Sequence, residues 1–126
     1  MARIAVFRGR DARLNKAIFW ILAQQGSLTI YDVWRKLRIQ RDFTYIPYNT
    51  VNRRVRALAE HGYIEKSGKR ETKTGFTAIL YRLTVRAYLT ILLDKIDIDN
   101  LVEKAPEASI LSMIEAIIFA KDFLEK

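Results

Sequence analysis

The side chains best suited to make functional contacts are arginines and asparagines in one short segment, residues 47–62, which reads PYNTVNRRVRALAEHG. At 100° per residue, Asn49, Arg53 and Arg56 fall on one side of a helix and Asn52 on its flank. Arginine hydrogen-bonds to guanine and asparagine to adenine in the major groove of DNA. The segment therefore predicts a helix whose outer face contacts base edges, with a solvated face that binds nothing as the alternative.

The same segment carries the signals of a short amphipathic helix. Val51, Val55 and Leu58 fall on the side opposite the arginines, so we expect them to pack inward. Pro47 suits a first helical turn, where its missing N–H has no intrahelical partner. Gly62 suits a left-handed C-terminal cap. These signals predict a helix over residues 47–61.

A second cationic group follows in a segment with strand character. Residues 63–67 have strand character and residues 76–84 are rich in β-branched and aromatic side chains, which together predict a β-hairpin. The polar stretch 68–75 between them is long for a hairpin loop, so we expect a projecting tip, or wing. Its basic residues should contact phosphates or a narrow minor groove, and they are Lys69, Arg70 and Lys73.

Two helices must precede this unit and position it. Leu14, Ala17, Ile18, Ile21 and Leu22 recur at helical spacing and predict a core helix over about 12–25 that starts at Asp11 and stops at Gly26. Residues 27–28 could form a brief strand. Thr29 with Asp32 resembles a helix start, and a second helix is expected over about 30–38.

The connector 39–46 is longer than the turn of a simple helix-turn-helix. Together with Tyr48 it carries the aromatic residues Phe43 and Tyr45. We expect these rings to brace the turn, with stacking on sugars or bases as the alternative.

The C-terminal part is predicted to be helical throughout. Thr84 can cap a helix whose apolar face contains Tyr88, Leu89, Leu92 and Leu93, and a last helix opens at Pro106 and Glu107. Apolar residues occupy more than half of the circumference of the last helix, and packing against one surface requires a narrower apolar arc. A second copy of the chain would bury that excess, with folding back of the helix on its own domain as the alternative. The residues expected in a dimer interface are Ile110, Met113, Ile114, Ile117, Ile118 and Leu124.

Net charge divides the chain unequally. Residues 1–86 hold 18 Lys/Arg and 6 Asp/Glu, whereas residues 87–126 hold 4 and 8, within an overall charge of +8. A basic body with an acidic tail suits one part that meets a polyanion and another that meets protein. There are no cysteines, no secretory leader is expected at the N-terminus, and no apolar run is long enough for a membrane span. We therefore expect a cytoplasmic protein without disulfides.

Residues for catalysis are lacking. The single histidine, His61, falls at the predicted end of a helix, where a cap or dipole contact accounts for it. Neither a metal-ligand spacing nor a phosphate-binding glycine loop is present. The sequence predicts no enzyme activity, no cofactor and no metal.

The order helix, helix, helix, basic-tipped hairpin, helix resembles a winged-helix DNA-binding domain. The segment TVNRRVRALAEHGYIEK (50–66), the wing and YRLT (81–84) resemble small prokaryotic regulators of the MarR, PadR and penicillinase-repressor kinds, over about residues 11–86. The resemblance implies a mainly α fold with a small β-hairpin, plus a C-terminal helical dimerisation extension. It also implies a third helix in the major groove and a wing on the backbone or minor groove. The chain departs from the family pattern at residues 85–87, where many relatives have a glycine, so we expect the hairpin to run straight into the fourth helix.

Carried over by position, the DNA-facing residues are Asn49, Thr50, Asn52, Arg53 and Arg56 on the helix, with Lys69, Arg70 and Lys73 on the wing. The implied function is sequence-specific binding of double-stranded DNA by a homodimeric transcriptional regulator, with domains 1–86 and 87–126. Two alternatives stay open: a winged-helix module that binds protein, and a DNA-binding protein with a replication or structural role. The sequence names no operator and no effector ligand.

Overall fold

The computed structural model describes residues 4–125, which form two compact units. The first unit ends at Asp94 and the second begins at Lys95. This division lies one helix later than the predicted boundary between 1–86 and 87–126. The reason is that helix α4 (Val85–Lys95) packs on the first unit through buried Ala87 and Thr90.

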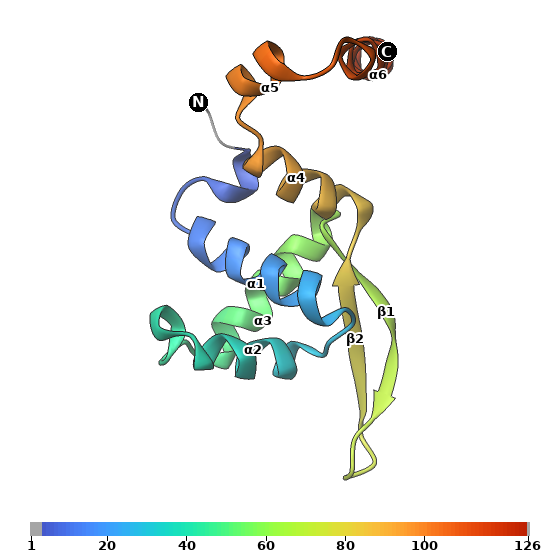
Figure 1. Ribbon diagram of the computed structural model, residues 1–126. Helices are drawn as coiled ribbons and strands as arrows, with labels where there is room; N and C mark the ends of the chain where they lie inside the picture. Colours follow the sequence, from blue (N-terminus) through green and yellow to red (C-terminus); the bar gives the residue numbers. More distant parts are fainter. Residues whose placement is uncertain (1–3, 126) are drawn as a thin grey trace. The chain divides into compact units, whose positions relative to one another are not determined.

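The first unit is a set of helices with one antiparallel hairpin (Figure 1). Its other elements are η1 (Ala5–Phe7), α1 (Ala12–Gln25), α2 (Ile30–Ile39), η2 (Arg41–Phe43), α3 (Tyr48–Glu60), β1 (Ile64–Glu71) and β2 (Thr77–Leu83). The order of three helices, hairpin and helix confirms the winged-helix arrangement. Helix α1 has the predicted bounds and ends at Gly26, whose φ of 78° is left-handed. Helix α2 starts where Thr29 Oγ1 accepts the Asp32 N–H at 3.0 Å.

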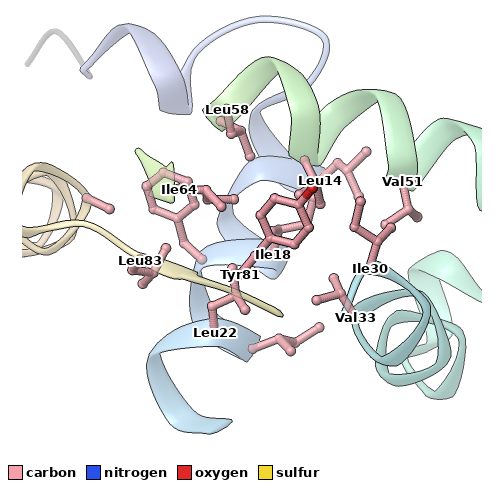
Figure 2. Close-up of a cluster of buried hydrophobic side chains, with 14 of the residues drawn as sticks. Leu14, Ile18, Leu22, Ile30, Val33, Val51, Leu58, Ile64, Tyr81 and Leu83 are labelled. Carbon is pink, nitrogen blue, oxygen red and sulfur yellow. The ribbon is translucent and has the colours of Figure 1, made fainter. Parts of the chain in front are cut away.

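A single hydrophobic core joins α1, α2, α3 and the base of the hairpin (Figure 2). The predicted inward residues of α3, Val51, Val55 and Leu58, are at most 1% exposed. They belong to one core with buried residues of the other elements. These are Ile18 and Leu22 of α1, Ile30 and Val33 of α2, and Ile64, Tyr81 and Leu83 of the hairpin. This core fixes which face of α3 is turned to solvent.

The hairpin differs from the predicted wing of 68–75. Strand β1 continues to Glu71, with Lys69 opposite Ile79 and Arg70 opposite Ala78, so the connecting loop spans only residues 72–76. The prediction was wrong because it took a polar run for a loop. Much of this ribbon projects into solvent, so its strands do not need the alternation of apolar and polar residues that marks a half-buried sheet.

A third, very short strand partner was predicted at residues 27–28, and it is present. Leu28 forms an isolated antiparallel bridge with Tyr81. The Leu28 N–H donates to the Tyr81 carbonyl at 3.0 Å, and the Tyr81 N–H donates back at 2.8 Å. The bridge ties the start of α2 to the base of β2.

Helix α3 is one residue shorter at each end than the predicted 47–61. Pro47 has ψ of 146° and precedes the helix, while His61 is its C-cap residue. Gly62 follows with φ of 85°, its N–H donates to the Ala59 carbonyl, and the Tyr63 N–H donates to the Leu58 carbonyl at 2.9 Å. These two backbone hydrogen bonds form a Schellman cap, the left-handed C-terminal cap that Gly62 predicted.

Large apolar side chains remain exposed toward the C-terminus. Helix α4 follows β2 directly, and its apolar face, Tyr88, Leu89, Leu92 and Leu93, is 45–60% exposed. The second unit contains α5 (Ile98–Lys104) and α6 (Glu107–Leu124), neither of which has a buried residue. No helix within residues 4–125 is long and apolar enough to cross a membrane.

Candidate nucleic-acid interface

The outer face of α3 carries the polar residues that the sequence singled out. Asn49, Arg53 and Arg56 are exposed, and Asn52 is half-buried on the flank. Thr50 is also half-buried, on the flank away from Asn52, so it is the least available of the predicted helix residues. The burial pattern follows from the inward packing of Val51, Val55 and Leu58.

The entry to α3 is held by side chains of α2. Trp34 Nε1 donates to the Ile46 carbonyl at 2.9 Å, and Arg38 Nε donates to the Thr44 carbonyl at 3.3 Å. The Trp34 ring also packs edge-on against Tyr48, with 5.7 Å between ring centroids. These bonds and the Gly62 cap hold α3 at both ends, so its outward side chains start from a fixed backbone.

The three aromatic residues of this region play different parts. Phe43 packs against the core and Tyr48 against Trp34, which is the bracing expected of them. Tyr45 is 92% exposed and braces nothing. Because its neighbours Thr44 and Ile46 are held by α2, the Tyr45 ring projects from an ordered turn just before α3.

A cleft of about 350 Å³ lies between α3, the start of α2 and the hairpin. It brings together three predicted site residues from two elements: Asn52 and Arg56 from α3, and Arg70 from β1. Hydroxyl groups of Thr72 and Thr77 also belong to residues that line it. Such donors, with the guanidinium groups, could hold a phosphate backbone beside the helix.

Two interactions at the cleft were not predicted from the sequence. Arg70 Nη2 forms an ion pair with Asp32 Oδ2 at 3.0 Å, so the hairpin is tied to the first turn of α2. Arg56 Nε donates to Asn52 Oδ1 at 3.1 Å. This bond joins side chains one helical turn apart and holds the Arg56 guanidinium beside Asn52. The sequence signalled Asp32 as part of a helix start, but contained nothing that placed it opposite Arg70.

Most carboxylates of the basic body are already paired with arginines. The pairs are Asp11 with Arg54 at 2.7 Å, Asp32 with Arg70 at 3.0 Å, Glu65 with Arg82 at 2.9 Å, and Asp42 with Arg13. Within residues 4–125, no carboxylate forms an ion pair with Arg53, Arg56, Lys69 or Lys73. The positive charges of Arg53 and Arg56 on the outer face of α3, and those of Lys69 and Lys73 on the hairpin, are therefore not neutralised by ion pairs among the described residues.

Some predicted residues lie outside the cleft. Lys69 is on β1 and Lys73 in the loop, both exposed but not among the cleft residues. The expected dimer residues lie on α6: Ile110 and Met113 are half-buried, while Ile114, Ile117, Ile118 and Leu124 are 47–81% exposed. Among the described residues, no group of three His, Asp or Glu side chains could hold a metal ion.

Comparison with known proteins gives a structural likeness without a sequence match. No protein-family model matches the chain, and no curated protein does. The structure resembles a PadR-like transcriptional regulator from Bacillus cereus, with a TM-score of 0.55 and 12% identity over 87% of this chain and 97% of that one. It also resembles Bacillus subtilis PadR in complex with operator DNA, with a TM-score of 0.52 and 16% identity over 92% of this chain and 70% of that one.

Proposed function

We propose that the protein is a homodimeric transcriptional regulator that binds double-stranded DNA sequence-specifically. Helix α3 enters the major groove, and the basic hairpin lies on the backbone or minor groove. The observation that carries this proposal is the unneutralised outer face of α3, where Arg53 and Arg56 project while nearby carboxylates pair elsewhere. The likeness to PadR in complex with operator DNA supports it.

The roles of the side chains follow from their placement. Arg53 and Arg56 suit guanine edges and Asn49 and Asn52 suit adenine, because each offers paired donor or acceptor atoms. Thr50, on the half-buried flank, suits a phosphate. Lys69, Arg70 and Lys73 belong to a projecting ribbon and suit phosphates or a narrow minor groove.

The experiment is selection of bound sequences from random duplex DNA, followed by affinity measurement with Arg53→Ala. Loss of a bidentate arginine–guanine contact should weaken the selected site by about 1–3 kcal/mol. Binding to random DNA should fall far less. Arg86→Ala, which removes an exposed arginine of α4, is the control. Equal losses on both DNAs would reduce Arg53 to a phosphate contact, and absence of any enriched sequence would favour the protein-binding or structural alternatives.

Dimerisation would hide the apolar surface of α6. Exposed Ile114, Ile117 and Ile118 suit a two-fold contact in which the same patch of each copy meets the other. Two copies would then present their α3 helices about one DNA turn apart, roughly 34–36 Å, to a near-palindromic site.

A pair of glutamate substitutions on α6 tests this assembly. In Ile117→Glu a charge enters the proposed seam, so light scattering should show a monomer and specific DNA affinity should fall. Ser112→Glu adds the same charge on the side of α6 that carries Glu115 and Asp122, and this variant should stay dimeric. A wild-type protein that is monomeric at micromolar concentration would end the dimer proposal, although DNA reading by α3 could survive.

A further inference from the structure

A second hollow, of about 390 Å³, lies on the other flank of α3 from the cleft. It is formed by the η1 segment, the start of α1, the second half of α3 and Tyr63. We call it the basic hollow and define it by its polar residues Arg8, Arg10, Asp11, Asn15, Arg54 and His61. None of these is among the residues proposed to contact DNA.

Positive charge exceeds negative charge in the basic hollow. It holds three arginines and one carboxylate, Asp11, whose Oδ2 accepts from Arg54 Nη1 at 2.7 Å. Arg10 Nε lies 3.8 Å from the other carboxylate oxygen, beyond hydrogen-bond distance. Arg8 has no ion pair with any described carboxylate. One carboxylate cannot neutralise three guanidinium groups, so the hollow favours an anion.

Two residues that line the basic hollow each have a buried side-chain atom without a hydrogen-bond partner among the described residues. Asn15 is 5% exposed; its Nδ2 donates to the Val6 carbonyl at 2.8 Å, while its Oδ1 has no partner among the described residues. The Nε of Arg54 is also buried without a partner there. A buried donor and a buried acceptor left unpaired are unfavourable, so a group that satisfies both is stabilised.

The required ligand therefore accepts hydrogen bonds from guanidinium groups and also donates one to an amide oxygen. A phosphate monoester near neutral pH does both, because its second pKa near 6 leaves a fraction carrying an O–H beside charged oxygens. A sulfate and a DNA phosphodiester lack that proton. Arginine binds phosphate strongly through paired N–H groups.

We propose that the basic hollow is a binding site for inorganic phosphate or for the phosphate monoester of a small molecule. Arg8, Arg10 and Arg54 contact the charged oxygens, and Asn15 Oδ1 accepts the remaining O–H. Exposed Arg8 and Arg10 can move to admit the group. The proposal goes beyond DNA binding, because it needs neither the outer face of α3 nor the hairpin.

The test is calorimetric titration of the full chain with inorganic phosphate at pH 7, without DNA, against sulfate at equal ionic strength. Phosphate should bind saturably and at least tenfold more tightly than sulfate. The double variant Arg8→Ala/Arg10→Ala should lose at least tenfold in phosphate affinity. Arg13→Ala removes an exposed arginine of α1 that does not line the hollow, and it should bind phosphate like the wild type.

Circular dichroism and the melting temperature keep a folding defect apart from a binding defect. Arg8 and Arg10 are exposed, so the double variant should melt like the wild type. Absence of saturable phosphate binding by the wild type, equal affinity for sulfate, or unchanged affinity in the folded double variant would each overturn the proposal. If the double variant binds DNA with a reduced salt dependence while the wild type ignores phosphate, the hollow contacts the DNA backbone instead. That outcome also overturns the phosphate site but leaves the proposed function standing.

Discussion

Asp32 forms an ion pair with Arg70, which we propose to contact DNA, and removing the Asp32 charge should strengthen DNA binding while weakening the fold. Its carboxylate lies 3.0 Å from Arg70, with side chains that are 17% and 52% exposed. In Asp32→Asn the charge is lost but the size is kept, so Arg70 becomes available to a phosphate. One added phosphate contact makes the plot of log affinity against log salt concentration steeper by about 0.9. The gain in DNA affinity should therefore be about eightfold larger at 0.1 M salt than at 1 M salt.

The cost to stability comes from the same carboxylate. A half-exposed ion pair contributes about 0–1 kcal/mol, and a carboxylate in the first turn of a helix about 0.3–1 kcal/mol. Asp32→Asn should therefore lower the free energy of unfolding by about 1 kcal/mol, which in a domain of this size lowers Tm by about 4–8 °C. The two effects have opposite signs, so a general loss of structure cannot imitate them.

Fluorescence anisotropy with labelled duplex across a series of salt concentrations measures the first effect, and calorimetry the second. Glu65→Gln is the control, because it removes an equal charge from the Arg82 pair at 2.9 Å, away from the cleft. An unchanged salt slope in Asp32→Asn, or an equal change in Glu65→Gln, would refute the reasoning that Arg70 is specifically held back from DNA.

Two further substitutions test the cap of α3 and the hairpin. Gly62→Ala should destabilise the protein by about 1–2 kcal/mol in urea unfolding, because alanine is strained at φ of 85° although its Cβ would lie 3.7 Å from the nearest atom, in Arg86; an unchanged midpoint would contradict the strain. Lys69→Gln with Lys73→Gln should lower affinity for every DNA sequence and reduce the salt slope by about 1.8, because two phosphate contacts are lost; a slope equal to that of wild type would remove both lysines from the interface.

Local patterns predicted the helical part of the fold well. The spacing of Val51, Val55 and Leu58 identified the buried face of α3, and Gly62 identified its end. These features succeed because a helix repeats every 3.6 residues and a left-handed cap strongly favours glycine. The continuation of β1 through Lys69 and Arg70 was not predicted, because a ribbon exposed to solvent on both faces does not require apolar residues at every second position.

Contacts between elements distant in sequence were beyond prediction. Nothing local paired Arg70 with Asp32, or left an atom of Asn15 unpartnered beside Arg54. On α4 the periodicity identified the apolar stripe of Tyr88, Leu89, Leu92 and Leu93, but the face packed on the first unit contains the small residues Ala87 and Thr90. Small side chains allow close approach of a helix to its support, and a hydrophobicity pattern does not rank them above leucine.

The bridge between Leu28 and Tyr81 has a consequence for the order of events in folding. Its two hydrogen bonds close a chain segment that contains all of α2, α3 and β1, so we expect this contact to carry an entropic cost of loop closure and to form after the helices. Once formed, it opens only when that whole segment loosens. The Leu28 and Tyr81 amides should therefore be among the slowest to exchange with deuterium, at a rate set by global unfolding, while the amides of the exposed loop 72–76 exchange through local fluctuations.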